Sequence, residues 1–140
     1  MIHDYIHKVH YHETDKMGVT HHANYIKWME EARVDFLEQI GYGYARLERD
    51  GIISPVIALD CQYKHPTTFD DEVSIHIQVE EFRGVRLVIG YTMTNVKTAD
   101  VVLTGTSTNC LTDRTGMPIM LRRQFPDFDL ALRALAAKEG

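Results

Sequence analysis

The segment from Tyr11 to Tyr25 carries the densest set of reactive side chains, and Asp15 lies near its middle. Asp15 follows a strand pattern, stands among turn-forming residues, and precedes the start of a helical pattern. The first turn of a helix offers unpaired backbone N–H groups and the positive end of the helix dipole, which together stabilise an oxyanion. A carboxylate and a polarising N–H that face one carbonyl carbon are sufficient to hydrolyse a thioester, because a thiolate leaves readily. Asp15 and the helix start are therefore a candidate hydrolytic centre.

Two elements must position this centre. Alternation of side-chain type predicts a strand from about Tyr5 to His12, directly before Asp15. Apolar residues at helical spacing predict a long helix from about His22 to Ile40, and Gly41 is a natural C-terminal stop. The apolar stripe is too wide for a helix that rests on one neighbour, so we expect a helix cupped by a curved sheet. The stripe consists of Tyr25, Trp28, Met29, Ala32, Phe36 and Ile40.

The rest of the chain is rich in strand patterns. Further strands are predicted at Val56–Lys64, Val73–Glu80, Val85–Val96 and Val101–Leu111. A short helical turn is predicted at Tyr44–Arg49 and a terminal helix at Asp127–Lys138. Sequential strands joined by short turns favour antiparallel pairing. The expected fold class is α+β, an antiparallel sheet of about five strands around one long central helix.

Length and composition limit the class of protein. The chain has 140 residues, of which 44% are hydrophobic and 25% charged, so we expect one compact domain spanning residues 1–140. The net charge of −5 is unlike that of a nucleic-acid-binding domain, which is usually basic. No apolar run reaches the ~20 residues that span a membrane. The segment after Met1 lacks the pattern of a signal peptide, and the two cysteines, Cys61 and Cys110, lack CxxC spacing. We therefore expect a reduced, cytoplasmic protein.

Two strings of residues resemble a known family. The first is Asp15-x-x-Gly18-Val19-x-x-His22-Ala23-Asn24-Tyr25, followed by Glu30-Glu31-Ala32-Arg33 and Gly41. The second is Val56-x-x-Leu59-x-Cys61-x-Tyr63-x-x-Pro66. Together they closely resemble the 4-hydroxybenzoyl-CoA thioesterase branch of the hot-dog superfamily, which includes the short-chain acyl-CoA thioesterases associated with the Tol–Pal cluster. The resemblance extends from about Tyr5 to Leu121.

This resemblance implies a fold, an activity and an assembly. The fold is the hot-dog fold, in which a sheet wraps a long helix, and the assembly is a homodimer or a homotetramer made of two dimers. The site lies at a subunit interface, and an acyl-CoA thioester is hydrolysed to a free acid and CoA. Neither an organic cofactor nor a metal ion is needed, and neither nucleic acid nor a membrane is a partner.

The resemblance also implies roles for particular residues. Asp15 matches the catalytic aspartate of the family, which acts either as a nucleophile through an anhydride or as a general base for water. The oxyanion N–H maps to the backbone amide of His22, and Gly18 lets the loop backbone approach the substrate. Near the helix start, the residues expected to contact substrate are His21, Asn24, Tyr25 and Trp28. Because CoA carries phosphates, a basic patch is also expected. Its candidates are Arg122 and Arg123, with Lys64, Arg83 and Arg86 as others, and any single one of them also suits solvated surface charge. Relatives commonly carry an aromatic residue in place of His21. This difference changes the polarity of the acyl pocket, so the identity of the acyl group is left undecided.

Several residues have simpler interpretations. Asp15 is also a common turn former or helix cap, and the aromatic residues near the helix start suit a core position. The pairs His10 with His12 and His21 with His22 could be considered as zinc ligands, but adjacent histidines at a helix start diverge. Another hot-dog branch uses a helical glutamate. Here Glu30 and Glu31 lie outside the apolar stripe and suit solvent or an interface.

Two other functions remain open. Hydration or dehydration of an acyl thioester would use a paired aspartate and histidine, with His22 as the histidine. A non-catalytic acyl-CoA-binding module would bind CoA without releasing free thiol. The presence of Asp15 favours hydrolysis over the binding module.

Overall fold

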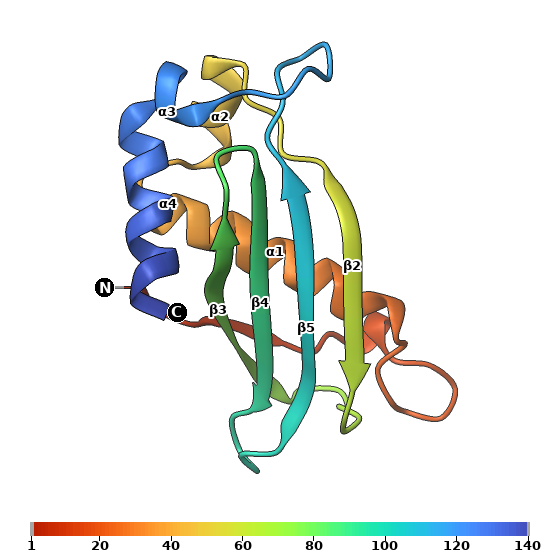
Figure 1. The fold of residues 1–140 in the computed structure, drawn as a ribbon. Helices are drawn as coiled ribbons and strands as arrows, with labels where there is room; N and C mark the ends of the chain where they lie inside the picture. Colours follow the sequence, from red (N-terminus) through yellow and green to blue (C-terminus); the bar gives the residue numbers. More distant parts are fainter. Residues whose placement is uncertain (1, 140) are drawn as a thin grey trace. The chain divides into compact units, whose positions relative to one another are not determined.

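The structure, a computed structural model, describes residues 2–139; Met1 and Gly140, the ends of the predicted domain, lie outside the described residues. The strands are β1 (Tyr5–Lys8), β2 (Val56–Tyr63), β3 (Glu72–Phe82), β4 (Arg86–Asn95) and β5 (Val101–Cys110). They form one five-stranded sheet with the order β1-β3-β4-β5-β2, in which neighbouring strands run antiparallel (Figure 1). The helices are η1 (Tyr11–Glu13), α1 (Ala23–Gln39), α2 (Tyr44–Asp50), α3 (Leu121–Gln124) and α4 (Pro126–Glu139). The predicted α+β hot-dog fold is confirmed.

Contacts between residues divide the chain into two compact units. The first unit comprises Met1–Phe36, Cys61–Ile77 and Tyr91–Gly105. The second unit comprises Leu37–Asp60, Gln78–Gly90 and Thr106–Gly140. Helix α1 and strands β2 to β5 contribute residues to both units, so continuous elements run through the two sets of contacts. A single domain over residues 1–140 stays a prediction.

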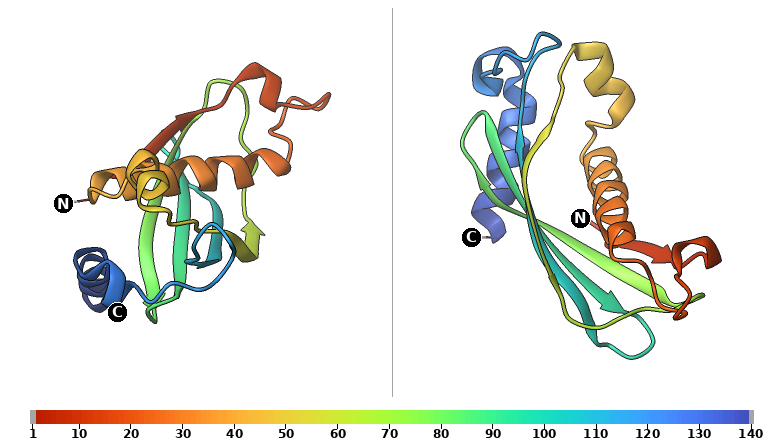
Figure 2. Two further views of the ribbon diagram at one scale, coloured as in Figure 1. Left: turned by 90° about the horizontal axis from the view of Figure 1, so that it is seen from above. Right: turned by 90° about the vertical axis from the view of Figure 1, so that its right-hand side faces the viewer.

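In the first unit, one side of α1 forms the core. Its buried residues are Tyr25, Trp28, Met29, Ala32 and Phe36, which are five of the six residues of the predicted apolar stripe. The sixth, Ile40, is half-buried and follows the end of the helix. Both views in Figure 2 show this part of α1 lying across one face of the strands. The strands contribute buried side chains at alternating positions, such as Val73, Ile75 and Ile77 of β3. The two periodicities seen in the sequence are therefore those of the packed faces.

The first strand is shorter than the sequence predicts. Strand β1 ends at Lys8, although the backbone of Val9 still exchanges hydrogen bonds with Asp70 and Asp71. The chain then closes the 3₁₀ turn η1, in which the N–H of Glu13 donates to the carbonyl of His10 over 2.9 Å. The Glu13 carboxylate accepts the N–H of His10 over 2.8 Å. The prediction of a strand as far as His12 is wrong because this side-chain contact stabilises a turn instead.

The second unit contains the end of α1 and the C-terminal helices. Gly41 adopts φ +89°, a left-handed conformation, and the N–H of Tyr42 returns to the carbonyl of Leu37 over 2.8 Å. The predicted stop is therefore confirmed as a helix C-cap. Helix α3 is not expected from the sequence. Helix α4 starts at Pro126, which is pre-shaped for the first helical position.

Strand β2 lies at one edge of the sheet and is nearly all exposed in the single chain. Apolar side chains lie along it, and Ile57 is 54% exposed. An uncovered apolar edge strand offers unpaired backbone groups to another strand. The exposed apolar residues are Val56, Ile57, Leu59 and Tyr63.

Among the described residues, no helix combines the length and the apolar character that crossing a membrane requires.

Candidate active site

Asp15 lies in a tight exposed loop between η1 and α1. The isolated bridge between Thr14 and Thr20 closes the loop, and the N–H of Asp15 donates to the carbonyl of Val19 over 2.8 Å. The N–H of Gly18 donates to the Asp15 carbonyl over 2.9 Å, and Gly18 adopts φ +80°. A β-carbon on Gly18 would have no atom within 4 Å, so the backbone conformation rather than lack of space requires glycine here.

The carboxylate of Asp15 supports the turn. Its Oδ1 accepts the N–H of Met17 over 2.8 Å, which is the turn-forming role considered from the sequence. Its Oδ2 has no hydrogen-bond or ion-pair partner within the part of the chain that the structure describes. One oxygen therefore orients the side chain and the other faces outward.

The amides at the start of α1 are not equivalent. The N–H of His21 donates to the carbonyl of Glu13 over 2.9 Å, and the N–H of Ala23 donates to Nδ1 of His21 over 3.2 Å. The N–H of Asn24 donates to the His21 carbonyl over 3.0 Å. For the exposed His22 N–H, no acceptor is present among the described residues. One amide at the helix start is thus left open between paired neighbours.

Within residues 2–139 of one chain, no hydrogen bond or ion pair joins Asp15 to His22. Both groups belong to the first unit, and both are exposed. The convergence of these two groups on one carbonyl therefore stays a prediction.

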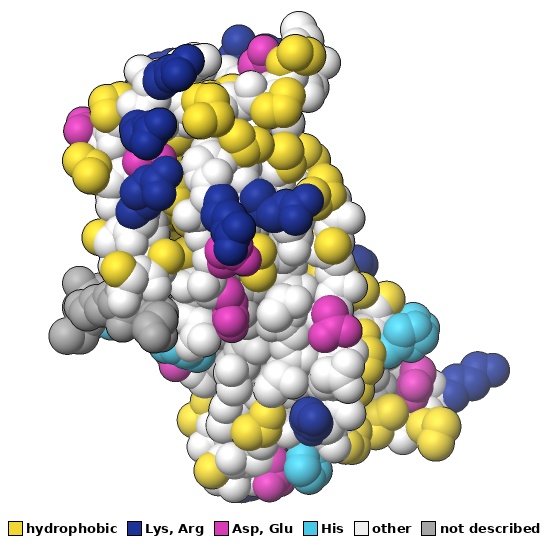
Figure 3. Space-filling view, in the orientation of Figure 1, with side chains coloured by type: hydrophobic (Ala, Val, Ile, Leu, Met, Phe, Trp, Pro, Cys, Tyr) yellow, Lys and Arg dark blue, Asp and Glu magenta, His cyan; other side chains and the backbone are white. Residues whose placement is uncertain are grey.

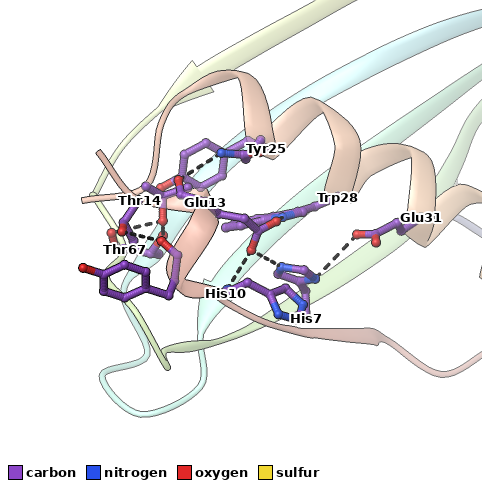
Figure 4. Close-up of polar contacts among 11 residues, drawn as sticks. His7, His10, Glu13, Thr14, Tyr25, Trp28, Glu31 and Thr67 are labelled. Carbon is purple, nitrogen blue, oxygen red and sulfur yellow. Dashed lines mark hydrogen bonds and ion pairs between the residues drawn. The ribbon is translucent and has the colours of Figure 1, made fainter. Parts of the chain in front are cut away.

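Glu13, two residues before Asp15, is buried at 6% exposure and fully engaged (Figure 4). Its Oε1 accepts hydrogen bonds from Nε2 of His7 over 2.9 Å and from the His10 N–H over 2.8 Å. Its Oε2 accepts the indole N–H of Trp28 over 2.7 Å. A single carboxylate therefore joins β1, η1 and α1.

Burial alone would raise the pKa of Glu13. Hydrogen bonds from the His10 backbone, the Trp28 indole and His7, together with the charge of His7, outweigh burial and lower the pKa below its ordinary value of 4.5. The imidazole of His7 also places Nδ1 3.5 Å from Oε2 of Glu31. The His7 ring therefore lies between the carboxylates of Glu13 and Glu31.

The other end of the loop is fixed by hydroxyl groups. Thr67 is fully buried, and its hydroxyl lies 2.6 Å from that of Thr20 and 2.9 Å from that of Tyr25. The backbone N–H of Thr20 also donates to the Thr67 carbonyl over 2.8 Å. The residues at the two ends of the exposed Asp15 loop, Glu13 and Thr20, are therefore buried and hydrogen-bonded.

One group of possible metal ligands occurs among the described residues. Ligand atoms of His7, His10 and Glu13 lie within 4.8 Å of one another. Nε2 of His7 and Oε1 of Glu13 are at hydrogen-bond distance, and both oxygens of Glu13 accept N–H groups, so the arrangement is complete without an ion. The residues His12, His21 and His22 are outside this group.

The predicted substrate-contact residues of the helix start fall into two sets. Tyr25 and Trp28 are buried in the core, as the simpler interpretation expected. His21 is exposed and caps α1 through Nδ1, and the side-chain amide of Asn24 donates to the Glu13 carbonyl over 2.9 Å. Their roles in binding substrate stay predictions.

Arg122 and Arg123 are exposed on α3, in the second unit. Figure 3 shows Lys and Arg side chains gathered over α3, α4 and the nearby ends of the strands. The exposed arginines of this unit's sheet and C-terminal helices are Arg83, Arg86, Arg122, Arg123 and Arg133. The structure thus provides a basic surface, and its use for CoA phosphates stays a prediction.

Glu13 and His7 are the residues that the sequence analysis missed. The signal was weak, because a Glu before a Thr-Asp turn and a His in a short strand are both ordinary surface residues. Glu31, considered only as a possible catalytic glutamate, is exposed and contacts His7, whereas Glu30 is simply exposed. Only the folded chain brings the two carboxylates to one imidazole.

The fold is that of a hot-dog protein, and comparison with known proteins assigns the chain to the thioester hydrolase class. The chain belongs to the thioesterase-like superfamily, which it matches over residues 9–134. The sequence prediction of a thioester hydrolase is thereby confirmed.

Individual relatives agree with this family. YneP of Bacillus subtilis (strain 168), which carries the provisional name of an acyl-CoA thioesterase, is 34% identical over 125 residues, covering 89% of this chain and 90% of YneP. The acyl-CoA thioester hydrolase YbgC of Escherichia coli O157:H7 is 28% identical over 90 residues, covering 64% of this chain and 67% of YbgC. A crystal structure of DHNA-CoA thioesterase from Staphylococcus aureus superposes with a TM-score of 0.89 at 35% identity, covering 99% of this chain and 95% of that one.

Proposed function

We propose that the protein hydrolyses an acyl-CoA thioester to a free acid and CoA, with Asp15 and the backbone amide of His22 as its catalytic groups. The observation that carries this proposal is the N–H of His22 at the start of α1, which has no acceptor among the described residues and lies between the paired amides of His21 and Ala23. An open N–H at the positive end of a helix dipole is suited to a developing oxyanion. The names of the relatives support the substrate class.

In the proposed reaction the thioester carbonyl oxygen accepts the His22 N–H. Asp15 either takes a proton from water that attacks the carbonyl carbon, or attacks that carbon itself and forms an anhydride that water then opens. In both routes the C–S bond breaks and the sulfur leaves as CoA thiolate. In the general-base route the acid gains an oxygen from water. In the anhydride route water that attacks the Asp15 carbonyl leaves its oxygen on Asp15, and the acid departs with an Asp15 oxygen. Neither route requires an organic cofactor or a metal ion, and we propose that none is used.

We further propose that the chain belongs to the 4-hydroxybenzoyl-CoA thioesterase branch, with the Tol–Pal-associated enzymes among its relatives. The support is the spacing of Asp15, Gly18 and His22 before the helix. The substrate for which the Staphylococcus aureus enzyme is named, DHNA-CoA, adds an aromatic acyl group to the candidates. Benzoyl, dihydroxynaphthoyl and short aliphatic thioesters are therefore the substrates to compare.

The active assembly that we propose is a homodimer or a dimer of dimers in the cytoplasm. Its support is β2, an exposed edge strand with apolar side chains. Pairing of this edge with a second copy would cover the strand and add the partner's residues to the site. The predicted interface location of the site rests on this pairing.

The proposal is tested by thiol release from a panel of acyl-CoA substrates. Asp15→Asn is expected to lower kcat/KM by at least about 100-fold, because the amide is neither a general base nor a nucleophile. Asp70→Asn is the matched control: Asp70 is an exposed carboxylate of the same unit, and its φ of +76° is one that asparagine tolerates. This control is expected to stay within about twofold of the unchanged protein.

Other outcomes would assign the protein differently. Near-normal kcat/KM in Asp15→Asn would remove Asp15 from the mechanism. Product formation without free thiol would indicate hydration or dehydration, and binding of CoA without any reaction would indicate a binding module. Transfer of ¹⁸O from labelled water into Asp15 in a single turnover would favour the anhydride route.

A further inference from the structure

We propose that Glu13 is a positioning residue for the hydrolysis proposed above, holding the start of α1 and the Asp15 loop in one geometry. The inference rests on that function and extends it to a buried residue that does not touch the substrate. Glu13 is suited to this role because its side chain and its backbone bind different parts of the site.

The side chain of Glu13 fixes the elements around the loop. Its two oxygens accept N–H groups from His7 of β1, from the His10 backbone and from Trp28 of α1 (Figure 4). These three donors come from before the loop and from after it. The contact with Trp28 anchors the second turn of α1 to the chain that leads into Asp15.

The backbone of Glu13 fixes the helix start directly. Its carbonyl accepts the N–H of His21 over 2.9 Å and the side-chain amide of Asn24 over 2.9 Å. These two residues flank His22 and Ala23, so the open N–H of His22 is held between two contacts with the same carbonyl. A shift of Glu13 would therefore move the proposed oxyanion donor.

Asp15 follows Glu13 by two residues, and the intervening Thr14 is also fixed. Its N–H and its hydroxyl both donate to the carbonyl of Tyr11, over 3.1 and 2.7 Å. The chain between Glu13 and Asp15 thus has little freedom. A displacement of about 1 Å at reacting groups costs roughly 100-fold in rate, so this rigidity has a direct kinetic consequence.

A glutamine at position 13 cannot accept all the hydrogen bonds that Glu13 accepts. The carboxylate accepts at both oxygens, whereas an amide offers one oxygen and one donor group. Whichever way the amide is turned, its NH₂ faces either the Trp28 indole N–H or the two N–H groups at Oε1. Glu13→Gln therefore disturbs the geometry while almost preserving side-chain volume.

The test compares four variants in steady-state hydrolysis, at a temperature where each is folded by circular dichroism. Glu13→Gln is expected to lower kcat by about 10- to 100-fold with KM within about threefold. Trp28→Phe removes one donor and retains an aromatic ring, and it is expected to lower kcat in the same way but less. Glu72→Gln, an exposed residue of β3, makes the same chemical change and is expected to leave kcat unchanged.

The fourth variant combines Glu13→Gln with Asp15→Asn. If Glu13 positions both the Asp15 carboxylate and the His22 amide, the part of its effect that acts through Asp15 disappears once Asp15 is replaced. The loss of rate in the double variant is then expected to be smaller than the product of the two single losses. Multiplicative losses would show that Glu13 affects the rate independently and would overturn the proposal. Wild-type kcat in both Glu13→Gln and Trp28→Phe would also overturn it. An unaffected Asp15→Asn would refute the proposed function instead, which separates the two failures.

A metal site at the same cluster would give a different result. Stoichiometric binding of zinc to the purified protein, lost in His10→Ala, would make Glu13 a ligand and would overturn the positioning role. The present proposal requires only the backbone N–H of His10, which alanine retains.

Discussion

The indole N–H of Trp28 donates to Oε2 of Glu13 over 2.7 Å, which joins a fully buried side chain of α1 to the residue two positions before Asp15. The residue that anchors the helix in the core is therefore also in contact with the loop that carries the proposed catalytic carboxylate. This single contact links the stability of the first unit to the geometry of the site.

The first prediction concerns stability at low pH. The pKa of Glu13 is lower in the folded chain than its ordinary value of 4.5, because its hydrogen bonds outweigh burial. The stabilisation is therefore fully present above the unfolded pKa and is lost as pH falls through the folded pKa. Urea unfolding of the wild-type protein and of Glu13→Gln is compared at several pH values. The difference in their unfolding free energies is expected to shrink below about pH 4.5. A difference that stays constant down to acid pH would contradict this.

The second prediction concerns the C-terminal end of the Asp15 loop, where the hydroxyl of Thr67 contacts Thr20 and Tyr25. Thr67→Val removes the hydroxyl that contacts both Thr20 and Tyr25 and leaves their hydroxyls without this partner. We expect a loss of about 1–3 kcal/mol of unfolding free energy, measured by urea denaturation. Thr68→Val is the matched control because Thr68 is exposed, and its cost is expected to stay below about 0.5 kcal/mol. Equal costs at the two positions would contradict a structural role for the buried hydroxyl cluster.

The third prediction concerns the basic surface on α3. Charge reversal at both Arg122 and Arg123 is expected to raise KM for acyl-CoA at least about fivefold with little change in kcat, because the contact would be with CoA phosphates rather than with the reacting atoms. The effect is expected to weaken as salt is increased. Arg49→Glu reverses an exposed charge of the same unit and is expected to leave KM unchanged. An unchanged KM in the double variant would remove this pair from the site.

The fourth prediction concerns the exposed edge of β2. Ile57→Lys places a charge among apolar side chains and is expected to shift the proposed assembly towards monomer, as measured by analytical ultracentrifugation. Gln62→Lys lies on the same strand at a position that is already polar, and it is expected to alter the assembly less. An Ile57→Lys protein with the oligomeric state of the unchanged chain would indicate that copies pair elsewhere.

Regular elements could be predicted because each has a local cause. The stripe from Tyr25 to Phe36 is buried at helical spacing, Gly41 ends the helix in a left-handed conformation, and β3 buries alternate residues as its pattern predicts. The predicted helix from His22 to Ile40 differs from the observed Ala23–Gln39 by one residue at each end. Spacing along one chain segment determines these features, so no distant partner needs to be known.

The sequence by itself determined the fold class and the superfamily, because spacing and motifs close together in the chain carry them. It also indicated roles for Asp15, Gly18 and His22, which stay predictions. Tertiary structure decided the rest. It ended β1 at Lys8, fixed Thr20 to Thr67 across 47 positions of the chain, and placed Glu13 against Trp28. A buried carboxylate is stable only when donors from separate elements reach it together, and sequence spacing does not encode that convergence.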